Sequence, residues 1–273
     1  MKKGLIKRGF NRLLFNIEHY FSRKHFRLLK TIYINLRSLP LKQAIKRPIY
    51  VYGNVKLDSL YGDIEIQGKI TRGMIKIGLP VNGAAIDTKK THFLNNGKIT
   101  FKGKVNICNG GSINNRGGNL ILGNGVIIGE NVRIVCTHHI EINEGTRIAH
   151  ESQIMDSNFH FIINTDSQST STANGKIIIG KYCWIGNRST IQKGTVLPDY
   201  TIAASNTLLN KDYSEIPQYS LIGGMPAKFI KSGLRRVFNI HNERMLKKYF
   251  KEHGNDATFT YEGEDINKFC ESI

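Results

Sequence analysis

The sequence contains little cysteine, and its cysteines are isolated. Cys108, Cys136, Cys183 and Cys270 are scattered over 273 residues, with no CxxC pair among them. Small secreted proteins that depend on disulfides have dense, regularly spaced cysteines instead. The spacing therefore excludes a disulfide framework and favours a reducing cytoplasm.

Long apolar runs are also missing. Lysine and arginine interrupt each apolar run near the N-terminus before it reaches the length of a signal peptide. No stretch approaches the roughly 20 apolar residues of a membrane span. We therefore expect a cytoplasmic protein that is neither secreted nor inserted into a membrane, and its 40% hydrophobic residues are enough to fill a core.

Acidic residues are scarce, most of all at the N-terminus. The whole chain has 39 Lys and Arg against 21 Asp and Glu, a formal net charge of +18. Residues 1–48 hold thirteen Lys and Arg and one acid, Glu18, which is +12 of that +18. Because the remainder is only mildly basic and no nucleic-acid-binding fold is visible, we do not expect nucleic acid as a partner.

What the sequence does contain is a period of six residues. Its first position is large and aliphatic with one exception, and its fifth is mostly small or β-branched. The first-position column is Leu122, Ile128, Ile134, Ile142, Ile148, Ile154, Ile179, Ile185, Ile191, Leu197 and Ala203. The fifth-position column is Val126, Val132, His138, Thr146, Ser152, Asn158, Cys183, Ser189, Thr195, Thr201 and Thr207.

A period of six is typical of a chain that bends once per repeat and closes a triangular coil in about eighteen residues. Stacked coils pair as parallel strands, with the aliphatic residue at each inner corner and the small residue where room is limited. This predicts an all-β solenoid over 49–231. Helical spacing in 1–48 and in 232–252, within a C-terminal segment 232–273, predicts helices that cap the two ends of the solenoid.

Two further stretches, "KYCWIGNRSTI" and "LIGGMPAKFI" at 221–230, extend the hexapeptide pattern. Together they resemble the left-handed parallel β-helix acyltransferases, particularly bacterial sugar and polysaccharide O-acetyltransferases that use acetyl-CoA. The resemblance is close over 100–231 and loose over 50–100. It implies a left-handed coil and a homotrimer whose active sites lie in grooves between neighbouring solenoids.

The longest interruption of the period is a polar loop at 155–176, and loops on rigid scaffolds are where sites are commonly built. It contains His160, and the resemblance implies that a histidine here is the general base that deprotonates the acceptor hydroxyl. Asp156 is interpreted either as the partner that orients His160 or as a turn-forming residue. Asn158 is predicted to contact the acceptor.

Other histidines lie on the coils. His139 and His150, with Glu151, are candidates for the acceptor site, and His138 is expected to point inward because it falls in the fifth-position column. Clustered imidazoles also raise the alternative of a zinc site as in the γ-class carbonic anhydrases, which share the β-helix. Because that alternative leaves the coenzyme-type motifs unexplained, we expect no metal.

Coenzyme binding is predicted from residues that the fold does not itself require. Trp184 falls outside both inward columns, so its ring should lie on the surface, whereas Cys183 should be an inert core thiol. Small residues would let the pantetheine arm approach the backbone, and lysines would meet the phosphates. The candidates are Trp184, Ala204, Ser205, Lys211, Gly223, Gly224, Lys228 and Lys231.

The predicted function is acetyl-CoA-dependent O-acetylation of a sugar hydroxyl on a cell-surface polysaccharide or its precursor. The alternatives are an N-acetyltransferase of an amino-sugar nucleotide, a γ-carbonic-anhydrase-like protein and a non-catalytic β-helix. Two interpretations of the basic segment 1–48 stay open. It could associate peripherally with an anionic membrane leaflet, or it could be a packing helix with solvated charges.

Overall fold

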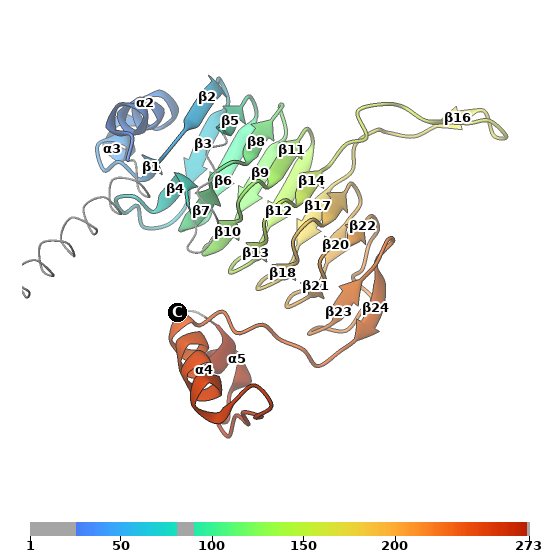
Figure 1. Ribbon diagram of the computed structural model, residues 1–273. Helices are drawn as coiled ribbons and strands as arrows, with labels where there is room; N and C mark the ends of the chain where they lie inside the picture. The colour runs from blue at the N-terminus through green and yellow to red at the C-terminus, as the bar shows by residue number, and fades with distance from the viewer. Residues whose placement is uncertain (1–25, 81–89, 272–273) are drawn as a thin grey trace, which may run out of the picture.

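The protein winds into a stack of three-sided coils, with helices at its two ends (Figure 1). The computed structural model describes residues 26–80 and 90–271. The part of the helical prediction that covers residues 1–25 lies outside the described residues.

Each side of the coil is a sheet of strands that pair in parallel from one coil to the next. The first sheet consists of β1 (Ile49–Val51), β4 (Ile75–Leu79), β7 (Val105–Cys108), β10 (Val126–Ile128), β13 (Arg147–Ile148), β18 (Trp184–Ile185), β21 (Ile202–Ala203), β23 (Leu221–Gly223) and the antiparallel β24 (Lys228–Lys231). The second consists of β2 (Val55–Leu60), β5 (Thr91–Asn95), β8 (Ser112–Asn115), β11 (Arg133–Cys136), β14 (Gln153–Met155), β19 (Thr190–Gln192) and β22 (Leu208–Leu209). The third consists of β3 (Asp63–Ile66), β6 (Lys98–Phe101), β9 (Asn119–Leu122), β12 (His139–Ile142), β17 (Ile177–Ile179) and β20 (Val196–Leu197).

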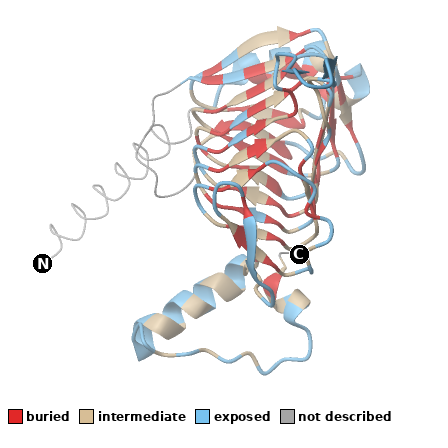
Figure 2. Ribbon diagram, turned by 90° about the vertical axis from the view of Figure 1, so that its right-hand side faces the viewer, coloured by how far each residue is buried: buried red, intermediate tan, exposed pale blue. Residues whose placement is uncertain are grey.

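The core is the column of aliphatic side chains inside the coils. Ile128, Ile148, Ile185 and Ala203 pair in register down the first sheet, and all four are buried. Figure 2 shows these buried positions as repeated bands along the stack. Every member of the first-position column is buried, so the period of six is confirmed as the spacing of the inner corners.

Two edges of the coil matter for the site. The serine edge, between the first and second sheets, has its turns at 129–132, 149–152, 186–189 and 204–207. Its inward hydroxyls donate to turn carbonyls, as Ser189 Oγ does to Gly186 O at 2.9 Å. The loop edge, between the second and third sheets, has turns at 116–118 and 137–138 and then the long loop 156–176.

His138 does not point inward as its place in the column predicted, because it is exposed. At the loop edge the inward position falls at the end of the second-sheet strand instead, where Asn115 pairs with Cys136 and both are buried. The two extra residues of this coil lie in the following turn and displace His138 to the outside.

The N-terminal end is capped by α2 (Leu28–Ser38), followed by α3 (Leu41–Ala44). The polar face of α2 turns inward: Asn35 exchanges hydrogen bonds with the backbone of Ile49, and Thr31 Oγ1 accepts from Val51 N at 3.0 Å. These side chains satisfy the free edge of β1, which could otherwise pair with another chain.

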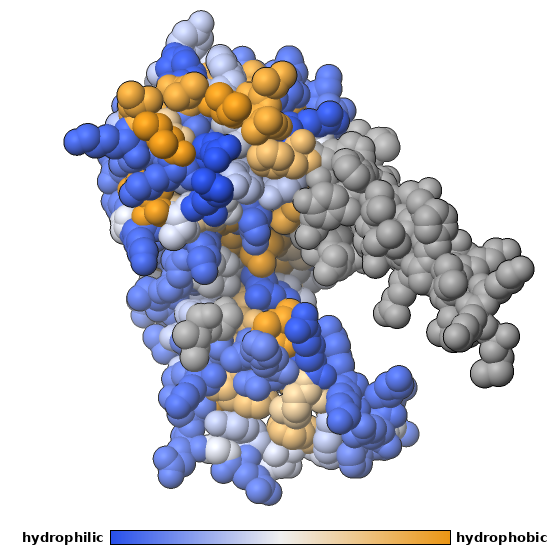
Figure 3. All heavy atoms as spheres, turned by 90° about the vertical axis from the view of Figure 1, so that its left-hand side faces the viewer, coloured by the Kyte–Doolittle hydropathy of each residue, from blue (hydrophilic) through white to orange (hydrophobic). Residues whose placement is uncertain are grey.

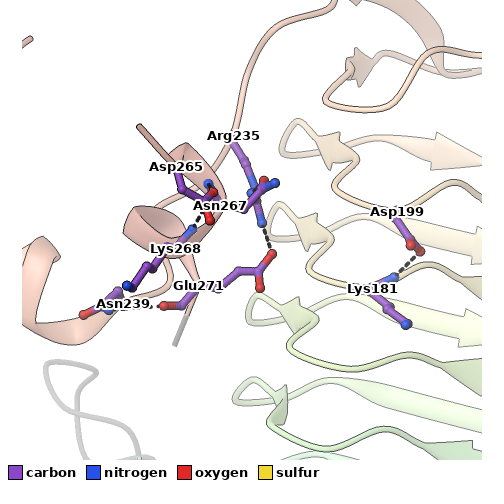
Figure 4. A network of polar contacts seen from close by, with 8 residues as sticks. All are labelled: Lys181, Asp199, Arg235, Asn239, Asp265, Asn267, Lys268 and Glu271. Carbon is purple, nitrogen blue, oxygen red and sulfur yellow. Dashed lines mark hydrogen bonds and ion pairs between the residues drawn. The ribbon is translucent and has the colours of Figure 1, made fainter. Parts of the chain in front are cut away.

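The C-terminal end differs from the expectation of a helical cap. β24 pairs antiparallel with β23 on the last coil, and α4 (Ile240–His253) and α5 (Ile266–Cys270) lie beside the stack (Figure 1). Helix α4 begins at Ile240 rather than near residue 232. Arg235, in the segment before it, binds Asn267 and forms an ion pair with Glu271 at 2.6 Å (Figure 4). That segment connects the helices to the solenoid.

Candidate active site

The loop 156–176 leaves the loop edge as a long arm that ends in a short hairpin. Its strands β15 (Ile163–Asn164) and β16 (Ser169–Thr170) pair antiparallel and project away from the stack (Figure 1). His160 and Asn158 lie at the base of the arm with exposed side chains. Among the residues that the structure describes, the His160 ring has no hydrogen-bond partner, so the imidazole is open to an incoming group.

Asp156, at the start of the arm, is fully buried, and its carboxylate holds the turn of the preceding coil. Its oxygens accept hydrogen bonds from the backbone N–H groups of Thr137, His138 and His139, each at 2.8 Å, and from Thr137 Oγ1 at 2.9 Å. Of the two roles that the sequence left open, these contacts are those of the turn-forming one. They do not connect Asp156 to His160, and the sequence analysis missed Thr137 as the partner.

The serine edge gathers a second set of predicted residues. His150 and Glu151 occupy one of its turns, and Arg188, in the turn above, pairs with Glu151 at 2.8 Å. Ala204 and Ser205 follow in the next turn, and Ser205 is exposed and hydrogen-bonds to Asn187.

Gly223 and Gly224 come next in this stack, where the last coil ends. A Cβ at Gly223 would approach the Cβ of Ala204 to 3.1 Å, so neighbouring turns are in close contact there. Small residues thus keep this edge smooth, as the predicted coenzyme path requires.

Trp184 lies on the outer face of the first sheet with 38% of its surface exposed, so the predicted surface position is correct. One side of its ring is covered by Arg236, whose guanidinium carbon lies 4.8 Å from the ring centre. Arg236 and Arg147 both stack on Phe238 as well, and burial together with the charge of Arg147 lowers the pKa of Arg236 to about 10. The period of six cannot reveal these contacts, because they join the coils to the C-terminal segment.

The predicted phosphate-binding lysines do not share one place. Lys228 and Lys231 are exposed on β24 at the last coil. Lys211 is exposed beyond β22, at the loop edge, with its ammonium 5.5 Å from the centre of the Tyr213 ring. A single phosphate group could therefore not engage all three within one chain.

His139 opens β12, next to the turn that Asp156 holds, and faces Glu141 and Asn119. No three histidine, cysteine or carboxylate side chains of the described residues gather as a metal ion would need, so the zinc alternative has no ligand set among them. Cys183 is fully buried and burial raises the pKa of its thiol to about 12, as expected of an inert core residue.

The structure thus divides the predicted site between two edges. His160, Asp156, Asn158 and His139 lie at the loop edge, whereas the small residues and His150 lie at the serine edge. Strand β14 crosses from one edge to the other, and the four residue steps from Ser152 to Asp156 span about 13 Å. Within one chain, the width of the second sheet separates the two sets.

Comparisons with known proteins agree on the type of fold. No protein-family model matches the chain. It is 26% identical over 108 residues to the putative lipopolysaccharide biosynthesis O-acetyl transferase WbbJ of Escherichia coli K12. The crystal structure of the polysialic-acid-specific acetyltransferase NeuO covers 78% of this chain and 85% of its own, with a TM-score of 0.51 and 17% identity. The fold is that of the left-handed β-helix acetyltransferases. The resemblance noted in the sequence is confirmed.

Two further comparisons bound what this likeness carries. The polysialic acid O-acetyltransferase OatWY aligns over 81% of this chain and 98% of its own, at 18% identity and a lower TM-score of 0.40. The alignment to WbbJ spans 37% of this chain and about half, 54%, of that protein. Among the described residues no helix has the length and apolar character that crossing a membrane needs.

Proposed function

We propose that this protein is an acetyl-CoA-dependent O-acetyltransferase that modifies a sugar hydroxyl of a cell-surface polysaccharide or its precursor. The observation that carries the proposal is the arm at the loop edge, which presents the unpartnered His160 imidazole beside a rigid coil. The named activities of WbbJ and NeuO supply the acyl group and the class of acceptor.

The proposed chemistry is direct transfer between two bound substrates. The acceptor oxygen bonds to the thioester carbonyl carbon while His160 takes the hydroxyl proton. The carbon–sulfur bond then breaks, and the coenzyme leaves as a thiolate that receives this proton. Binding both substrates in one groove supplies proximity, and the base adds roughly 10²–10⁴-fold.

The homotrimer belongs to the same proposal, because the separated edges need a second chain. In a groove between two solenoids, the loop edge of one chain faces the serine edge of its neighbour. His160 would then meet a thioester held along Ala204, Ser205 and Gly223 of the adjacent chain. Sedimentation should give about three times the 30.8 kDa chain mass, and an active monomer would contradict this arrangement.

The decisive experiment is release of free thiol from acetyl-CoA in the presence of acceptor sugars. We expect His160→Ala to lower kcat by about 10²–10⁴-fold with unchanged thermal stability, because the side chain is exposed and unpartnered. The matched control is His241→Ala, which removes an exposed histidine from the first turn of α4 and should keep full activity. Near-normal activity in His160→Ala would overturn the assignment of the base.

The acceptor screen also separates the alternatives. Hydroxyl sugars, oligosaccharides and amino-sugar nucleotides are offered in parallel, and thiol release is recorded for each. Turnover only with an amino acceptor would make the protein an N-acetyltransferase, and no turnover with any acceptor would favour a non-catalytic β-helix.

A further inference from the structure

The two helices that cap the first coil expose an apolar surface at one end of the molecule. Leu29, Leu36, Leu41 and Ile45 are each more than half exposed, at 82%, 56%, 65% and 66%. We call this the cap surface; it also includes Leu28, Ile32 and Tyr33, together with Tyr61 of the first coil. Figure 3 shows hydrophobic side chains gathered at this end.

The exposure follows from how α2 is used. Its polar residues Thr31 and Asn35 are fully buried because they satisfy the backbone of β1. The apolar residues of the same helix are therefore left on the outside, the reverse of an ordinary surface helix. An exposed apolar patch of this size marks an interaction site.

The charge around the patch indicates what covers it. Residues 26–48 contain six Lys and Arg and no Asp or Glu. Arg27 and Lys30 donate to carbonyls of the first coil, but Lys42 and Lys46 are exposed and form no ion pair with any described residue. The partner should therefore combine an apolar interior with a negative surface.

We infer that the cap surface docks on an anionic lipid membrane, with its leucines among the acyl chains and its lysines at the headgroups. Amphipathic helices that bind in the membrane plane have this combination of an apolar face and flanking cations. The inference goes beyond the proposed transferase activity and does not depend on it. It locates the peripheral association considered for the basic segment at a described surface.

The test is co-sedimentation of the full-length protein with two kinds of vesicle. One is pure phosphatidylcholine and the other also contains phosphatidylglycerol. We expect binding to the anionic vesicles alone, weakened by added salt. Leu36→Gln/Leu41→Gln should lower the affinity by on the order of tenfold or more per leucine, and Lys42→Gln/Lys46→Gln by about fivefold per cation.

A matched control removes apolar side chains of similar exposure elsewhere. Ile240→Gln/Ile266→Gln alters two residues of α4 and α5 that are 48% and 49% exposed, and it should bind as the unchanged protein does. Equal binding by the Leu36/Leu41 variant would overturn the inference, as would equal binding to both kinds of vesicle. It would also be overturned if that variant changed only the oligomer mass, since the cap surface would then join two chains.

Discussion

Two carboxylates flank strand β14, and their surroundings differ. Glu151, before the strand, is exposed at the serine edge and pairs with an exposed Arg188. Asp156, after the strand, is fully buried at the loop edge and binds three successive backbone N–H groups. A buried charge costs several kcal/mol unless it is fully hydrogen-bonded, whereas an exposed ion pair contributes little.

This difference explains why the loop can leave the coil at one edge only. At the serine edge, turns of similar length stack on each other and hydroxyls such as Ser189 bind the carbonyls. At the loop edge, the carboxylate of Asp156 closes the turn below and thereby provides a rigid base for the arm that carries His160. We infer that the architecture at Asp156 positions the loop without contacting His160.

The largest expected effect is that of Asp156→Ala. It removes the acceptor of four hydrogen bonds and leaves the N–H groups of residues 137–139 without their partner. We expect the free energy of unfolding to fall by about 3–5 kcal/mol, measured by chemical denaturation. Asp156→Asn should lose less, because its amide oxygen still accepts. Unchanged stability with lost activity would instead favour the orienting role.

A smaller effect is expected at the opposite edge from Ser189→Ala. The hydroxyl donates to Gly186 O at 2.9 Å and approaches Ala204 O at 3.2 Å. Loss of this bond should lower the free energy of unfolding by about 1 kcal/mol, measured in the same denaturation experiment. A cost equal to that of Asp156→Ala would erase the distinction drawn between the two edges.

The smallest effect on stability is expected from Glu151→Gln. Both members of the Arg188–Glu151 pair are largely exposed, so the change should be within about 1 kcal/mol. The informative measurement is the KM for the acceptor, which should rise if Glu151 contacts the sugar as the sequence analysis predicted. An unchanged KM would leave Glu151 a surface residue.

Much of the fold could be predicted because it repeats. Isoleucine at each sixth position and glycine or asparagine in the turns are local features, and they determine how one coil closes. The surface position of Trp184 and the core position of Cys183 follow from the same register. The arm was predictable as well, because it is the longest departure from that register.

The sequence by itself therefore determined the coil, its interior and the segment that leaves it. Only the tertiary structure decided which way His138 faces, which groups Asp156 binds and that Arg236 covers one side of Trp184. It also decided that the polar face of α2 turns inward and its leucines outward. The physical reason is the same in each case: these contacts join residues about twenty or more positions apart, so they depend on how coils and flanking segments stack.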